Sequence, residues 1–154
     1  MSQSPTFSTQ LLGQTEKAAN AILYRLLSQP GLTEHQWITL SIAVRNGGDV
    51  DTRELTDQVA SALRITKADA RARITELAAS QLLDVPDDER APVKLTDAGL
   101  QLHTPIRAAV TRITERLWGD LPAADLATAG RVLSTVLERA NAELNSARPS
   151  AAPR

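Results

Sequence analysis

Apolar residues recur every three or four positions in several separate stretches of this chain, which predicts a mainly helical protein. The first stretch covers residues 9–28 and ends at Pro30-Gly31. Thr33 is placed to cap a second helix, and Gln36, three residues further on, completes a capping box. Gly47-Gly48 then ends this second helix.

The middle of the chain alternates between short helical and extended patterns. A helix is predicted over residues 52–63, and Arg64-Ile65 separates it from a second, more basic helix that starts at Thr66. Two paired strands are predicted over residues 82–85 and 93–95. Helix, turn, basic helix and two-stranded ribbon in this order predict a winged helix-turn-helix, which places one helix in a DNA groove.

Two more helical patterns follow the ribbon. Thr96 is the expected cap of a long helix, and Pro105 inside that pattern is expected to kink or interrupt it. Pro122 suits the first position of the last helix. Residues 146–154 are small, polar and proline-rich, so we expect a disordered tail there.

The first helix and the last two carry more apolar surface than the compact module between them can bury. We therefore expect residues 9–30 and 98–145 to be a helical dimerisation region around a winged helix-turn-helix of residues 33–97, although these helices could instead cover the core of one monomer. A homodimer would set two recognition helices about one DNA turn (roughly 34 Å) apart on a pseudo-palindromic site. The expected fold class is thus mainly α with a small β-wing and flanking dimerisation helices.

Positive charge is concentrated in one helix. The 154 residues carry a formal net charge of −1, which by itself is unfavourable for a DNA-binding protein. Between Arg64 and Thr75, however, four positive residues stand against a single negative one, Asp69. Aromatic residues make up only 3 % of the chain, which argues against single-strand binding by base stacking. Double-stranded DNA is therefore the expected partner.

Several other chemistries lack the residues they need. The absence of cysteine excludes disulfides and thiolate metal sites, and His35 and His103 are too far apart in sequence to predict a metal site. No glycine-rich phosphate loop, nucleophile elbow or paired-carboxylate motif occurs, so we expect neither an enzyme nor a bound cofactor. No apolar run resembles a signal peptide or a spanning helix, so a soluble, cytoplasmic protein without a membrane partner is expected.

Four short segments carry a family resemblance. They are Leu32-Thr33 with Gln36-Trp37, Ile74 to Leu83, Asp88-Glu89-Arg90 and Leu95-Thr96-Asp97-Ala98-Gly99. In order and spacing they resemble the MarR family of bacterial transcription regulators, over residues 9–145. The chain departs from the family at Gln81, where glycine is usual, and at Val85, where a basic residue often stands. The resemblance implies a homodimeric regulator, most often a repressor that a small ligand releases from DNA.

The basic helix is the expected DNA reader. Ala70, Ile74 and Leu77 fall on its inner face, so the opposite face is free to meet a base edge. There Arg71 could bind the O6 and N7 atoms of a guanine, and the alanines could contact thymine methyls. The alternative is a solvated helix face without DNA contacts. The residues expected at DNA are Thr66 at the helix start, Lys67, Ala68, Arg71, Ala72 and Thr75 on the outer face, and Arg73 at its flank.

The ribbon is expected to add a second set of DNA contacts. By its position Arg90 resembles the wing arginine that enters the minor groove, with Asp88 orienting it through a charge-assisted bond. The alternative is a salt bridge at a hairpin tip that never meets DNA. Lys94 and Arg53 are expected to contact phosphates with little specificity.

A small-molecule effector is the remaining expected partner. The family places its effector pocket between the dimerisation helices and the DNA-binding lobe, and Tyr24, Trp37 and His103 are the polar aromatic candidates to line it. The alternative is that these three side chains pack in the core or at the dimer interface. For the protein as a whole, the alternative to a DNA-binding regulator is a winged-helix module that has lost DNA binding and mediates protein association.

Overall fold

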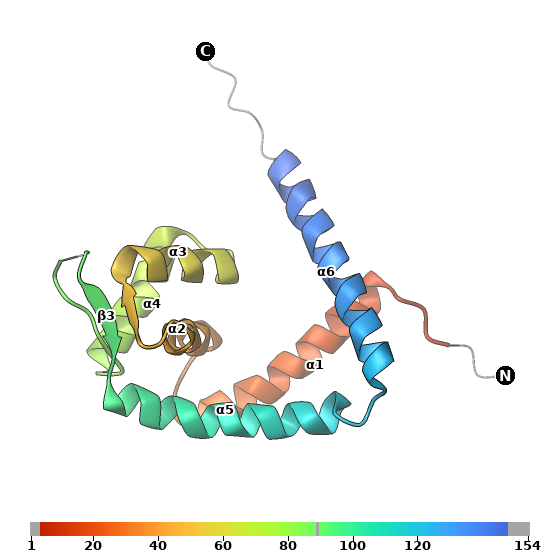
Figure 1. Cartoon of the computed structure of the whole chain (residues 1–154), viewed down its shortest axis with the longest axis horizontal. Coiled ribbons are helices and arrows are strands. Elements are labelled where there is room, and N and C mark those ends of the chain that lie inside the picture. The colour runs from red at the N-terminus through yellow and green to blue at the C-terminus, as the bar shows by residue number, and fades with distance from the viewer. Residues whose placement is uncertain (1–3, 89, 148–154) are drawn as a thin grey trace, which may run out of the picture. The chain divides into compact units, whose positions relative to one another are not determined.

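A computed structural model of the chain describes residues 4–88 and 90–147. These residues form six helices and one small antiparallel sheet with the strand order β1-β3-β2 (Figure 1). The predicted fold class, mainly helical with a small β-wing, is confirmed. The elements are α1 (Thr9–Ser28), α2 (Glu34–Arg45), β1 (Asp49–Asp51), α3 (Thr52–Leu63), α4 (Lys67–Ala79), β2 (Leu83–Asp84), β3 (Pro92–Leu95), α5 (Asp97–Trp118) and α6 (Ala123–Ser146).

Side chains cap the helices where the sequence predicted it. The Thr33 hydroxyl accepts the Gln36 N–H at 3.1 Å while the Gln36 side chain accepts the Thr33 N–H at 3.0 Å, so the predicted capping box at α2 is confirmed. Thr66 accepts the Asp69 N–H at 3.1 Å and caps α4. Such caps satisfy backbone donors that the first helical turn leaves unpaired.

The wing has three strands, whereas the sequence predicted two. Strand β1 pairs with β3 in the register Val50↔Val93, and β2 pairs with the same strand in the register Leu83↔Leu95. The extra strand was missed because it offers a single buried residue, Val50, between two exposed aspartates. Only the partner strand, far along the chain, makes this short segment extended.

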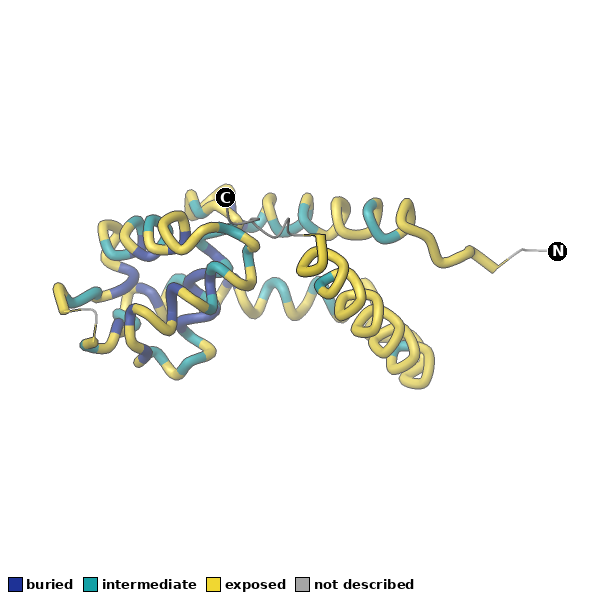
Figure 2. The backbone as a smooth tube through the Cα atoms, turned by 90° about the horizontal axis from the view of Figure 1, so that it is seen from above, coloured by how far each residue is buried: buried dark blue, intermediate teal, exposed yellow. Residues whose placement is uncertain are grey.

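The apolar core of the first part of the chain lies between α2, α3, α4 and the sheet. Leu40, Leu55, Val59, Ile74 and Val93 are among its fully buried members, and they come from all four of these elements. Figure 2 shows the buried positions gathered in this module. Because the inner side of α4 is buried in this core, its other side is held toward solvent.

A glycine and a threonine join α5 to the wing. The Thr96 hydroxyl donates to the Gln81 carbonyl at 2.7 Å and the Leu82 carbonyl at 3.0 Å, and it accepts the Gly99 N–H at 2.9 Å. A Cβ atom on Gly99 would lie only 2.2 Å from the Leu82 carbonyl oxygen. The Leu-Thr-x-x-Gly segment therefore has a packing role, because it fixes the start of α5 against the residues that follow α4.

The chain divides into two compact units, residues 1–112 and 113–154, and α5 runs on from the first into the second. Pro105 lies inside α5 and does not interrupt it, which leaves a kink as the remaining part of that prediction. The reason is that proline removes one backbone hydrogen bond from a long helix whose other bonds remain. Pro122 is the N-cap of α6, one position before the predicted place.

The end of the chain is helical further than predicted, because Ser146 still belongs to α6. The rest of the predicted tail, from residue 148 on, lies outside the described residues. In the described segments no helix combines the length and apolar character needed to cross a membrane.

Candidate nucleic-acid interface

The turn between α3 and α4 sets the direction of the recognition helix. Arg64 ends α3 in the left-handed conformation, with φ 54° and ψ 44°. The next residue, Ile65, donates its N–H to the Ala60 carbonyl at 3.1 Å, which closes the C-terminus of α3. Thr66 is extended and starts α4 immediately, so only three residues join the two helices of the motif.

The two faces of α4 differ as the sequence predicted. Ala70, Ile74 and Leu77 are at most 1 % exposed and belong to the core. On the other side four of the expected DNA contacts, Lys67, Ala68, Arg71 and Thr75, are exposed, and Ala72 is half-buried. The Thr75 hydroxyl donates to the Arg71 carbonyl of its own helix at 3.0 Å, so it would offer DNA its lone pairs. This face combines positive charge with small side chains that allow close approach.

Two of the predicted DNA cations are paired with carboxylates that the sequence analysis did not single out. The Lys67 ammonium lies 3.1 Å from Asp57 on α3. Arg73 is half-buried and lies 2.9 Å from Glu76, whose other oxygen accepts the Gln36 side-chain N–H at 2.9 Å. Glu76 therefore ties α4 to the capped start of α2, and Arg73 is paired with this carboxylate within α4.

The wing carries its charges in alternation. Lys94 is exposed on the central strand and lies directly opposite Asp49 on β1 and Asp84 on β2. Arg90 is exposed at the wing tip, and the Asp88 carboxylate accepts its backbone N–H at 2.9 Å. Asp88 thus holds the backbone of the tip, whereas the sequence predicted that it orients the guanidinium. Arg53, the last predicted phosphate contact, is exposed in the first turn of α3.

Two of the three predicted effector-binding aromatics lie together in the core. The Trp37 and His103 rings stack with centroids 4.8 Å apart and planes inclined by 16°. Both are buried, and the Ser41 hydroxyl lies 3.3 Å from His103 Nε2. Burial, and then the positive charge of Arg107, lower the pKa of His103 below its usual range. This trio packs α5 on α2, as the alternative interpretation held for Trp37 and His103.

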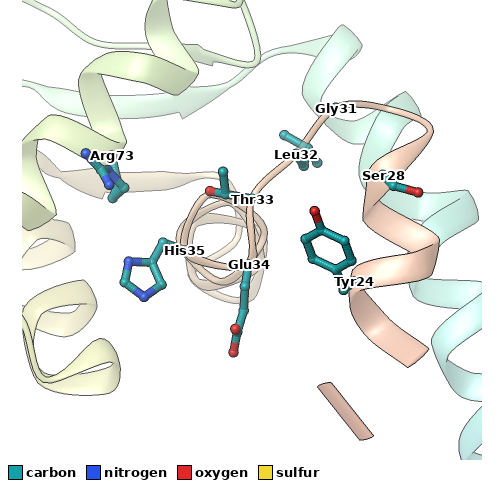
Figure 3. A pocket seen from close by; sticks show the side chains of 8 residues that line it. All are labelled: Tyr24, Ser28, Gly31, Leu32, Thr33, Glu34, His35 and Arg73. Atoms are coloured by element: carbon teal, nitrogen blue, oxygen red, sulfur yellow. The ribbon is translucent and has the colours of Figure 1, made fainter. Parts of the chain in front are cut away.

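Tyr24 lies apart from that stack, in a cavity of about 530 Å³ beside the start of α2. Figure 3 shows Tyr24 and His35 on either side of the first turn of α2. The cavity is lined by Tyr24, Ser28, Gly31, Leu32, Thr33, Glu34, His35 and Arg73. Its lining therefore comes from α1, α2 and the recognition helix, and it sets hydroxyl, imidazole and guanidinium groups and the Glu34 carboxylate next to apolar carbon.

Among the described residues no group of histidine, aspartate and glutamate side chains is arranged to hold a metal ion. The arrangement of α4 and the wing offers charge and hydrogen-bonding groups, which suit recognition of a polyanion.

No protein-family model matches the chain, and no curated protein matches it in sequence. Solved structures do match. A MarR protein from Peptoclostridium difficile is 16 % identical with a TM-score of 0.71, over 96 % of this chain and all of that one (100 %). MepR from Staphylococcus aureus in complex with DNA is 18 % identical with a TM-score of 0.70, over 88 % of this chain and 99 % of that one. NadR in complex with 4-hydroxyphenylacetate is 20 % identical with a TM-score of 0.65, over 88 % of this chain and 98 % of that one.

These matches cover nearly the whole length of each solved protein, 98 % to 100 %. At 16 % to 20 % identity they establish the architecture and leave the activity open. The chain therefore has the winged helix-turn-helix fold of the MarR transcription regulators.

Proposed function

We propose that this protein is a double-stranded-DNA-binding transcription regulator that acts as a homodimer in the cytoplasm. The observation that carries the proposal is the two-sided recognition helix: α4 buries Ala70, Ile74 and Leu77 and presents Lys67 and Arg71 to solvent. A helix so fixed can enter the major groove without rearrangement. The solved MepR complex, in which a protein of this fold holds DNA, supports the same conclusion.

Binding of fragmented genomic DNA, followed by sequencing of the retained fragments, tests this proposal. We expect an enriched site with two related halves, and affinity for it that falls steeply with salt. Arg71→Ala should cost on the order of 1–3 kcal/mol and relax preference at one base position of each half-site. Glu143→Gln near the end of α6 is the control and should bind as the parent does. Fragments retained without sequence enrichment, or affinity indifferent to salt, would contradict the proposal.

The proposal of a homodimer rests on apolar side chains that are exposed to solvent in the described part of the chain. Helix α6 has no buried residue, yet Val132, Leu133, Val136 and Leu137 stand exposed along it. Leu117 and Trp118 at the end of α5 are exposed as well. Exposed apolar surface of this extent is typical of subunit interfaces. Sedimentation should show a dimer at micromolar concentration, and Val136→Glu should shift it to monomer. A parent protein that sediments as a monomer would contradict this.

We propose that a small aromatic acid is the effector and that it occupies the cavity beside Tyr24. Arg73 is the supporting feature, because it lines the cavity and belongs to the recognition helix. A carboxylate there would compete with Glu76 for the guanidinium and so act on α4. 4-Hydroxyphenylacetate is a suitable first probe, since NadR holds it in the same fold. This acid should weaken duplex binding by the parent protein, and it should leave the duplex affinity of the Arg73→Gln variant unchanged.

The second candidate function is a protein-interaction module without DNA binding. The balance of charge on the motif favours it: from Asp51 to Glu76, five basic residues are matched by five acidic ones. A duplex-binding measurement at low salt separates the two, because an interaction module would retain no DNA even there.

A further inference from the structure

Three of the basic side chains proposed to meet DNA are accompanied by carboxylates. Lys67 is paired with Asp57, Arg73 with Glu76, and Lys94 stands between Asp49 and Asp84 in the sheet. The first of these pairs differs from the others because it crosses between the two helices of the motif. It also lies at the first residue of the recognition helix, where a phosphate would approach.

Stability does not explain the Lys67–Asp57 pair. The two side chains are 76 % and 50 % exposed, so water screens their attraction and the pair contributes little to folding. The consequence of the pair is therefore electrostatic and lies at the surface that faces DNA.

We infer that Asp57 regulates DNA affinity: it lowers the protein's sequence-independent affinity for DNA by holding the Lys67 ammonium. This inference rests on the proposed duplex binding. Sequence-independent affinity comes from the release of counterions when basic side chains neutralise phosphates. A lysine already neutralised by a carboxylate 3.1 Å away releases fewer ions, and the carboxylate itself repels the phosphate.

The consequence is a shorter stay at competing sequences. A regulator meets many such sequences before its site, and weaker sequence-independent binding lets it leave each of them sooner. Base contacts from Arg71 and the small side chains of α4 do not depend on this ammonium. Asp57 thus reduces the phosphate contribution to binding, which is the same for every sequence. It leaves the contribution from base contacts, which differs between sequences.

The test compares Asp57→Asn with Glu54→Gln on binding to a short random-sequence duplex over a range of salt concentrations. Glu54 is the matched control, because it is an exposed carboxylate one turn earlier on α3; its side chain accepts from Gln58 and, among residues 4–88 and 90–147, forms no ion pair with a basic side chain. Asp57→Asn should tighten binding about three- to tenfold at low salt and steepen the salt dependence by about one ion per recognition helix. Glu54→Gln should change affinity by less than about twofold, and Asp57→Glu should behave as the parent.

The same substitutions made in a Lys67→Gln protein separate the effect of the ion pair from the effect of changing the protein's net charge. In Lys67→Gln protein, Asp57→Asn should have no more effect than Glu54→Gln, because the cation it releases is gone. Equal effects of Asp57→Asn and Glu54→Gln in the parent background would overturn the inference, as would an Asp57→Asn effect that survives without Lys67. In both cases the proposed DNA binding would stand. A parent protein that binds no duplex at low salt would overturn the proposed function and this inference together.

Discussion

Gly99 offers the sharpest test of how the wing is attached to α5. In Gly99→Ala the new Cβ would lie 2.2 Å from the Leu82 carbonyl oxygen and 3.1 Å from its carbon, both backbone atoms that cannot rotate away. Overpacking of a buried position costs about 1–3 kcal/mol, and the backbone contact places this case at the upper end. Alanine is favoured over glycine within a helix by up to about 1 kcal/mol, which offsets part of the loss. We expect a net loss of about 2 kcal/mol in the free energy of unfolding.

Denaturant unfolding at one fixed protein concentration measures this loss, since the stability of the proposed dimer would depend on concentration. The controls are Gly13→Ala and Gly130→Ala, two helical positions where an added Cβ meets no described atom within 4 Å apart from its chain neighbours and the backbone of its own helix turn. Both should stabilise the protein or leave it unchanged. The reasoning is refuted if Gly99→Ala unfolds at the same denaturant concentration as the controls, because the carbonyl contact would then carry no cost.

Three further predictions concern caps, titration and the wing tip. Thr66→Ala should lower the unfolding free energy by about 1 kcal/mol through loss of the α4 cap, and Thr66→Ser should restore it; equal stability of the two variants would contradict the cap. The pKa of His103 is lower in the folded chain, so the unfolded chain binds the proton more readily. The contribution of His103 to the free energy of unfolding should therefore be fully present above pH 6.5, the ordinary pKa of histidine. It should be lost as the pH falls below that value. Unfolding curves of His103→Gln should lose this slope, whereas His35→Gln should keep it. Finally, Asp88→Ala and Arg90→Ala should weaken duplex binding non-additively, since Asp88 holds the Arg90 backbone at 2.9 Å; additive, near-zero effects would remove both residues from the interface.

The features that the sequence determined by itself are those formed within a single helical turn or a single helix. The caps at Thr33, Thr66 and Thr96 join a side chain to a backbone N–H three residues away, so the interaction is complete within one helical turn. The burial of Ala70, Ile74 and Leu77 likewise follows from helical spacing alone. For this reason the helices, the inner face of α4 and the exposed face opposite were predicted correctly.

Tertiary structure decided what depends on a partner far along the chain. Val50 belongs to a strand only because Val93 pairs with it, and the stack of Trp37 on His103 exists only because α5 crosses α2. The same holds for the candidate site. The sequence predicted Lys67 on the outer face of the recognition helix, and the fold sets Asp57 beside it. Helical periodicity says which side of a helix faces inward and contains no information on which residue of a neighbouring helix lies opposite. Long-range contacts of this kind come from packing of the core, and they determine how much of the predicted positive charge remains available to DNA.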